Sequence, residues 1–517
     1  MKDSLGWPMA RRCARSFISI LSCLDYNTVR TVTKACLITI RSHSMSHDHS
    51  NAPAFPMKRC PFSPPPEYAQ IRAEAPVSKV TMPDGTQAWL LTRYDDVKAV
   101  LGDNRFSTDP ARDGYPFISP ARASLLKYEK PATLIRLDPP EHTRQRRMLT
   151  KEFMITQVEA MRPFIQETVD TLLDEMIAKG NSCDFAEEFA LALPTAVIAN
   201  LLGVPYEDRE FFQERAQAKL DLTADPSVPL KAGEEMRAYL DKLITRKMQN
   251  PGNRSDLISR LIGNQLVPGH LSREETLATI ELLLMGGHET TANMIALGTL
   301  SLLMNPDQKQ ALINDPSLVK NAIEEMLRFH TIVHYNGPRV AMEDVEIAGH
   351  LIRKGEGVMA MISAANRDPE KFPDPDTFNI HREALHHVAF SYGVHQCLGQ
   401  QLARLELSIV FTTLFKRLPG LALAVPVSEL KFNSDAFVYG IKSLPLKWEP
   451  EMQKFFSVDY SRCVGGGLCV MAAPKVFAQN EDDGLVIILD ENPPAEEHDN
   501  IREAARLCPA LCIHVDK

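Results

Sequence analysis

The sequence predicts a mainly helical domain with small β-sheets, followed by a small α+β domain. Residues 94–330 show a mostly helical pattern that is interrupted by Pro and Gly breakers. Two β-prone stretches, 77–91 and 340–360, flank this helical region. Near residue 449 the composition changes, and residues 451–517 carry twelve Asp/Glu against six Lys/Arg. These observations predict domains at 55–449 and 450–517.

The first residues are expected to form an N-terminal extension, residues 1–54. Residues 1–44 carry seven Lys/Arg against two Asp and are rich in Ser and Thr, which is typical of an organelle-targeting peptide. The favoured alternative is an upstream extension with the true start at Met45, because a bacterial-type domain begins soon after it. We therefore expect a cytoplasmic protein, or an organelle-targeted one if residues 1–44 are a genuine transit peptide.

Charge, hydropathy and cysteine positions limit the function. The net charge of −9 gives no indication of nucleic-acid binding. No apolar run reaches the roughly 18–20 residues that a membrane span requires. Ten cysteines in 517 residues do not suggest a disulfide framework. One cysteine lies alone at 397 and four lie in the last 55 residues, a distribution that suggests metal binding or catalysis.

The β-prone and loop segments have clear boundaries. Residues 77–82 and 87–91 flank the turn sequence Pro-Asp-Gly and predict a hairpin. Residues 366–396 are rich in Pro, Asp and Gly and predict a long ordered loop. A helix is expected to follow at about 398–416.

Leu271 to Leu303 predicts an unusually long helix. Ser272 and Glu275 have the spacing of a capping box at its start. Its centre holds Gly286 and Gly287, and each mid-helix glycine costs about 1 kcal/mol relative to Ala. This predicts either a local distortion beside something flat and bulky or a break into two shorter helices.

A single cysteine, Cys397, stands between a Gly-containing loop and a helix. Backbone N–H groups at a helix start stabilise negative charge and therefore favour a thiolate. A thiolate is the form that ligates iron. A cysteine by itself is more often a small buried apolar residue, but the surrounding pattern favours a ligand here.

Over about residues 55–450 the chain resembles the cytochrome P450 family, especially its soluble bacterial members. The signature Phe-x-x-Gly-x-His-x-Cys-x-Gly is matched at residues 390–399, with Ser391 where many relatives have Gly. The other matched motifs are Gly286-Gly287-His288-Glu289-Thr290, Glu325 with Arg328, Phe378 to Arg382, and His142 to Arg146. The resemblance implies the P450 fold.

The resemblance also implies a haem b cofactor with Cys397 as its iron ligand. His142 and Arg146 are four apart on a helix and share one face, which suits an anionic propionate. The residues implied in haem binding are His142, Arg146, Arg339, Phe390, Gly393 and His395.

Two further groups of residues receive roles from the resemblance. Glu289 and Thr290 are implied to relay protons to dioxygen. Glu325 and Arg328 are three apart and can pair. With Arg382, they are implied to hold the Cys397 loop.

The C-terminal cysteines are spaced as Cys-x5-Cys followed by a distant Cys-Pro, at Cys463, Cys469 and Cys508. Bacterial four-iron clusters use Cys-x2-Cys-x2-Cys, and the middle position here is Gly466. Residues 453–517 therefore resemble small bacterial ferredoxins with a 3Fe–4S cluster. A zinc site is the chemical alternative. Cys512 is expected to be a buried bystander, with a fourth ligand as the alternative.

The leading hypothesis is a haem-thiolate monooxygenase that acts on an apolar small molecule with O2. Electrons are expected from NAD(P)H through a separate ferredoxin reductase and then the fused cluster. A nitric-oxide-reductase-like member of the family is the alternative, because residues 294–298 and about 190–205 also resemble the fungal enzymes. The fused tail and the Glu289–Thr290 pair argue against it. A non-enzymatic haem or iron–sulfur redox sensor is the third hypothesis, although no output domain is visible.

Overall fold

The computed structural model describes residues 52–128, 131–249, 254–335, 337–434, 436–448, 455–491 and 493–515. The chain divides into two compact units, Met1–Trp448 and Glu449–Lys517. The expectations for residues 1–44 and Met45 lie outside the described residues. Thr81 donates its backbone N–H to Pro53 at 2.9 Å. Pro53, which we assigned to the extension, thus pairs with the first strand of the fold.

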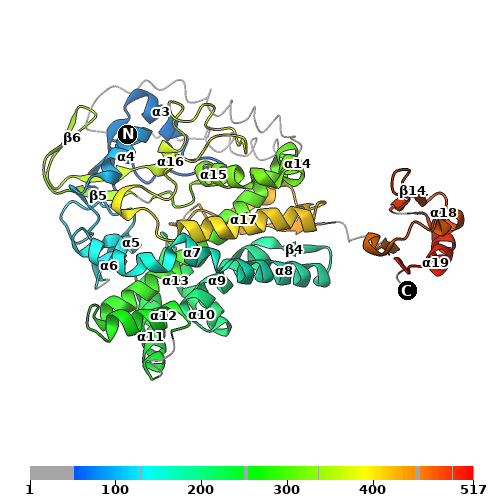
Figure 1. The fold of residues 1–517 in the computed structure, drawn as a ribbon. Coiled ribbons are helices and arrows are strands. Elements are labelled where there is room, and N and C mark those ends of the chain that lie inside the picture. The colour runs from blue at the N-terminus through cyan, green and yellow to red at the C-terminus, as the bar shows by residue number, and fades with distance from the viewer. Residues whose placement is uncertain are drawn as a thin grey trace, which may run out of the picture. The chain divides into compact units, whose positions relative to one another are not determined.

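Helices dominate the first unit (Figure 1). They are α3 (Glu67–Glu74), α4 (Tyr94–Gly102), α5 (Pro120–Tyr128), α6 (Glu141–Thr150), α7 (Ile155–Glu159), α8 (Arg162–Lys179), α9 (Ala192–Leu202), α10 (Arg209–Leu220), α11 (Ser227–Met248), α12 (Leu257–Leu261), α13 (Arg273–Met304), α14 (Pro306–Asn314), α15 (Val319–His330), α16 (Ile362–Ala365) and α17 (Gln400–Arg417). The central helix α13 packs against α9, α11, α15 and α17. The largest buried apolar cluster joins α8, α9, α13, α15 and α17.

The strands of the first unit form small sheets. They are β1 (Val77–Thr81), β2 (Gln87–Leu91), β3 (Phe106–Ser107), β4 (Ser182–Asp184), β5 (Pro338–Ala341), β6 (Val345–Ile347), β7 (His350–Ile352), β8 (Gly357–Ala360), β9 (Ala422–Leu423), β10 (Lys431–Phe432), β11 (Ile441–Ser443) and β12 (Pro445–Lys447). The largest sheet has the order β1-β2-β8-β5-β3, in which only β2 and β8 run parallel. The predicted hairpin at 77–91 is confirmed.

The long central helix is a single uninterrupted element. Both hydrogen bonds of the capping box between Ser272 and Glu275 are present, so its predicted start is confirmed. The alternative of two shorter helices is wrong. Close packing explains why a glycine stands at position 287 of this helix, because a Cβ atom there would lie 2.6 Å from the Ile198 side chain of α9. This glycine lets α9 and α13 approach closely.

The second unit is a small α+β fold. The strands β13 (Phe456–Val458) and β16 (Ile513–Val515) pair antiparallel, as do β14 (Phe477–Gln479) and β15 (Val486–Ile488). The helices α18 (Leu468–Ala472) and α19 (His498–Leu507) pack on each other. Within the described residues of both units, no helix is long and apolar enough to cross a membrane.

Candidate functional site: a cavity lined by a thiol and a cysteine-rich second unit

A mostly apolar cavity of about 370 Å3 lies between α13 and the loop that carries Cys397. This volume is within the range of small-molecule sites. Seven of the predicted residues line it, namely His142, Arg146, Thr290, Arg339, Phe390, His395 and Cys397. Gly393 and Glu289 are not part of the lining.

Cys397 lies just before the first residue of α17, as the sequence predicted. Its backbone N–H donates to the carbonyl of Phe390 at 2.9 Å, which closes the loop around the sulfur. Burial raises the pKa of the Cys397 thiol, while the N–H of Gly399 and the charge of Arg146 oppose this rise. The loop therefore provides donors for a thiolate, and a metal would supply the remaining stabilisation.

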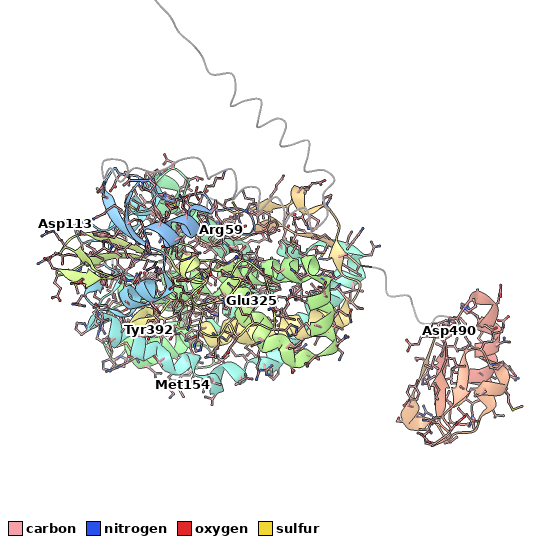
Figure 2. All side chains as sticks on the ribbon, turned by 90° about the horizontal axis from the view of Figure 1, so that it is seen from above. Arg59, Asp113, Met154, Glu325, Tyr392 and Asp490 are labelled. Atoms are coloured by element: carbon pink, nitrogen blue, oxygen red, sulfur yellow. The ribbon has the colours of Figure 1, made fainter. Side chains whose placement is uncertain are left out.

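Backbone geometry explains two signature positions of this loop. Gly393 has φ +73°, and a Cβ atom there would lie 2.5 Å from the carbonyl oxygen of Leu101. Only glycine fits this approach. Ser391, the departure from the family pattern, has φ +63°, a left-handed conformation that strains a side chain. Tyr392 between them reaches the surface, where Figure 2 labels it.

A cluster of arginine and histidine side chains lines another part of the same cavity. The rings of His142 and His395 lie 4.2 Å apart, and the Nδ1 atom of each is buried without a hydrogen-bond partner. Burial, followed by the charge of Arg339, lowers the pKa of His395 to about 2. The charge of Arg136 also lowers the pKa of His395, and the sequence analysis missed this arginine. Arg136 donates to the hydroxyl of Tyr115 at 3.0 Å.

These observations fit a haem. Buried polar atoms without partners are rare, so the two histidine Nδ1 atoms indicate a missing polar group. A carboxylate is the group that a cluster of buried guanidinium and imidazole groups favours. A flat cofactor with acidic side arms and an iron that takes a thiolate would satisfy both Cys397 and this cluster.

The opposite wall of the cavity belongs to α13. The hydroxyl of Thr290 donates to the carbonyl of Gly286 at 2.8 Å, which leaves its lone pairs available to accept. A Cβ atom at Gly286 would meet nothing within 4 Å, so the wall is open there. Burial raises the pKa of Glu289 to about 7. Glu289 precedes Thr290 on α13 and is not part of the cavity lining.

A buried ion network contacts the long loop 366–396, which leads to Cys397. Arg328 donates to both carboxylate oxygens of Glu325 at 2.7 and 2.8 Å, and neither side chain is exposed. Arg382 adds a third contact to Glu325 at 3.3 Å. Figure 2 shows Glu325 in the middle of the first unit. The backbone N–H of Asn379 also donates to Glu325 at 2.9 Å, so the network fixes the long loop 366–396.

A second network next to it was missed. Glu324 accepts two hydrogen bonds from Arg404, at 2.6 and 2.9 Å, and contacts His387 at 3.0 Å. Although burial alone would raise it, these partners bring the pKa of Glu324 down to about 2. The guanidinium of Arg404 lies 4.7 Å from the ring centre of Phe390. Glu324 thus ties α15 to α17 and, through Arg404, to the signature loop.

The second unit gathers four thiols around its small core. Three of them are partly buried against the core, namely Cys463, Cys469 and Cys508. Burial raises the pKa of Cys469, and the charges of the other two thiols add to this rise. Cys512 is 2% exposed, and its sulfur lies 3.4 Å from that of Cys508. No three metal-ligating side chains in the described residues surround a single point.

Comparison with known families identifies the first unit. Residues 76–420 match the family model of cytochrome P450. The chain belongs to the cytochrome P450 family. It is therefore a P450 monooxygenase, a class that acts on small molecules with O2, and the predicted fold is confirmed. Residues 458–515 match a second model, the 4Fe-4S single cluster domain of Ferredoxin I. The predicted ferredoxin-type unit, which follows the P450 unit in the sequence, is also confirmed.

Bacterial P450 enzymes are among the relatives. Cytochrome P450-SU2 of Streptomyces griseolus is 47% identical over 411 residues, which are 80% of this chain and all of the relative. Vitamin D3 dihydroxylase of the same organism is 45% identical and covers 77% of this chain and 98% of its own length. The crystal structure of mycinamicin VIII C21 methyl hydroxylase from Micromonospora griseorubida is 40% identical, with a TM-score of 0.73. It covers 77% of this chain and 100% of its own.

Proposed function

We propose that this P450 is a haem-thiolate monooxygenase that receives its electrons through its own C-terminal iron–sulfur unit. The observation that carries the proposal is the cavity that holds the Cys397 thiol, the arginine and histidine side chains with two unsatisfied Nδ1 atoms, and Thr290. The substrate is proposed to be an apolar small molecule, since most of the wall is apolar. The support is the family together with the side chains that line the cavity.

The haem-binding roles follow from position. Cys397 would ligate the iron, and His142, Arg146, Arg339 and His395 would hold the propionates. Phe390 and Gly393 would shape the loop, and Glu325, Arg328 and Arg382 would brace it. A bound haem supplies the iron at which O2 is activated, so that one oxygen atom enters the substrate and the other leaves as water.

The protein's own contribution to chemistry would be proton delivery. Thr290 holds a hydroxyl on the cavity wall, and Glu289 is the adjacent carboxyl with a pKa of about 7. A carboxyl with this pKa can both release and regain a proton at neutral pH.

The electron route is the remaining part of the proposal. Cys463, Cys469 and Cys508 would hold a 3Fe–4S cluster, because the position of a middle cysteine is Gly466. Electrons would come from NAD(P)H through a separate ferredoxin reductase. Because donor and acceptor would belong to one chain, their effective concentration for each other would be high. A cytoplasmic location is part of the same proposal.

Replacing Thr290 with alanine tests the proton role. We expect product formation to fall about a hundredfold while NAD(P)H oxidation continues, because the oxygen is diverted to hydrogen peroxide. Thr290→Ser retains a hydroxyl and should remain largely coupled. The measurement is the ratio of product and peroxide to NAD(P)H consumed. Full coupling in Thr290→Ala would contradict the relay.

The pH dependence of coupling tests Glu289. Because burial raises its pKa to about 7, the carboxyl is protonated below that pH and ionised above it. Coupling should therefore decline as the pH rises through about 7 in the unmodified enzyme. Glu289→Gln should be poorly coupled at every pH and should lack this transition. The same pH profile in both proteins would rule out Glu289 as the titrating group.

A further inference from the structure

Two cysteines of the second unit face each other across one tight turn. The sulfur atoms of Cys508 and Cys512 lie 3.4 Å apart, and the backbone N–H of Cys512 donates to the Cys508 sulfur at 3.5 Å. A disulfide places two sulfur atoms about 2.05 Å apart. The two sulfur atoms are thus within a short side-chain movement of bond formation.

The turn that joins the two cysteines is tight and strained. The backbone N–H of Leu511 donates to the carbonyl of Cys508 at 3.1 Å, so the chain reverses direction within four residues. Leu511 has φ +49°, a left-handed conformation that costs free energy for a residue with a side chain. Its side chain is 60% exposed, so its own packing does not offset this cost. The cost is offset after the turn, where Cys512 and Ile513 are buried in the core.

The two thiols differ in their access to solvent. Cys508 is partly exposed, whereas Cys512 is buried in the apolar core of the second unit. A small oxidant in solution therefore reaches the Cys508 sulfur first. Cys512 lies next to it in the position of a resolving thiol, which closes the bond after the first sulfur has reacted.

Packing alone does not require a thiol at position 512. A free cysteine in a core behaves as a small apolar residue, and another apolar side chain of similar size would fill the same space. The proposed three-iron cluster takes its thiolates from Cys463, Cys469 and Cys508, so Cys512 has no task in it. The feature that distinguishes Cys512 is its contact with the sulfur of a proposed cluster ligand.

We propose that Cys508 and Cys512 form a reversible disulfide in chains whose second unit carries no cluster, and that this bond prevents cluster insertion. The inference rests on the proposed iron–sulfur role of Cys508. An iron atom and a disulfide partner require the same sulfur atom, so the two states exclude each other. The pair thereby makes the electron supply of the enzyme depend on the oxidant around it.

Hydrogen peroxide, the by-product of uncoupled oxygen activation, is the proposed oxidant. The Cys508 sulfur attacks one peroxide oxygen, the O–O bond breaks, and one water leaves, which gives a sulfenic acid. The Cys512 sulfur then attacks the Cys508 sulfur and displaces the hydroxyl, which takes up a proton and leaves as a second water. Two thiols lose two electrons and two protons in total, and one peroxide becomes two waters. A dithiol reductant reverses the bond.

Peptide mapping of the full-length protein tests the bond. An iron chelator removes the cluster, a small molar excess of peroxide is added, and the remaining thiols are alkylated before digestion with trypsin. Residues 507–517 form one tryptic peptide that contains both cysteines. This peptide should escape alkylation and be lighter than the reduced peptide by about 2 Da, the mass of the two lost hydrogen atoms. Alkylation of both cysteines after peroxide treatment would overturn the proposal.

The peptide map also separates this pair from its competitor. Cys463 interacts with Cys512 as well. A bond between these two would cross-link the tryptic peptides 463–475 and 507–517, and that product would contradict the assignment. The matched control Cys463→Ser removes only the competitor and should still form the Cys508–Cys512 bond. In Cys512→Ser the sulfenic acid at Cys508 should persist and react with dimedone, and its absence would contradict the first step.

Cluster reconstitution tests the consequence of the bond. Peroxide-treated protein should incorporate less than about one-tenth of the cluster iron that reduced protein incorporates, and dithiothreitol should restore the difference. Equal incorporation by the disulfide form would show that the bond does not block the site. If the reduced protein incorporates no cluster, the proposed iron–sulfur function itself fails. If it incorporates a cluster and peroxide forms no bond, only this inference fails.

Discussion

Replacing Cys397 with alanine is expected to abolish the red-shifted absorption band of the reduced carbon-monoxide complex. That band depends on a thiolate ligand to the haem iron, which Cys397 would supply. The other sulfur atoms that line the cavity in the described residues are those of Met285 and Met294, which are thioethers. Activity should fall to the background level, because the thiolate also donates the electron density that favours cleavage of the O–O bond.

A second cysteine of the first unit provides the control for this variant. Cys183 of β4 is also a free, partly buried thiol, and burial raises its pKa to about 12. Cys183→Ala should leave the band unchanged. The arginine and histidine side chains proposed to hold the propionates should let Cys397→Ala retain some haem with an altered spectrum. A normal band in Cys397→Ala would show that another residue ligates the iron.

Local patterns made much of the fold predictable. The capping box at Ser272 and Glu275 involves residues three apart, and its hydrogen bonds depend on helical geometry alone. The contact of Glu325 with Arg328 has the same spacing. The hairpin at 77–91 needs only alternating apolar residues and a turn. In each case the partners are close in sequence, so the spacing already specifies the contact.

Long-range partners were not predictable in this way. Glu324 stands beside the recognised Glu325, but its partner Arg404 lies 80 residues away. Lys219 and Glu281, which form a buried ion pair, are 62 residues apart. No local spacing links such pairs, and each charge in isolation is typical of a solvated surface. A weak signal was available at Glu281, which is the one charged residue between Thr276 and Met285 of the predicted helix, where a charge needs a buried partner.

The roles of the two glycines in the long helix were only partly predictable, because the partners of each glycine are also distant in sequence. The sequence indicated that Gly286 and Gly287 were unusual but could not say which neighbour each one faces. The structure separates them, since Gly287 contacts Ile198 of a distant helix and Gly286 faces the open cavity. A close approach between two helices is a tertiary property, and it leaves no periodic pattern in either helix.

Replacing Gly466 with cysteine is expected to convert the proposed three-iron cluster into a four-iron cluster. Gly466 stands at the middle position of the cysteine motif and has no left-handed backbone conformation. A Cβ atom there would meet only Pro509, at 3.5 Å, which is ordinary contact. A fourth thiolate could therefore be introduced without moving the backbone, and cluster iron would rise from three to four atoms per chain.

The neighbouring glycines provide matched controls. Gly465 and Gly467 have φ +66° and +69°, and a Cβ atom at either one would lie 2.9 Å from an oxygen atom. Gly465→Cys and Gly467→Cys should therefore disturb the loop and lower cluster content, whereas Gly466→Cys should raise the iron count. The measurements are iron and sulfide analysis and electron paramagnetic resonance of the oxidised protein, in which the three-iron cluster is paramagnetic and the four-iron cluster is silent.

The iron count of the unmodified protein also decides the role of Cys512. Its sulfur lies 3.4 Å from that of Cys508, and burial raises its pKa to about 12, so we expect a neutral thiol that contacts a ligand without binding iron. Cys512→Ala should then retain three cluster irons, counted after the haem iron is subtracted, and the same resonance signal. If the cluster of the unmodified protein instead holds four irons and Cys512→Ala lowers that number to three, Cys512 is the fourth ligand. In that case the thiolate of Cys512 would complete a four-iron cluster, although Gly466 stands at the position of the usual middle cysteine.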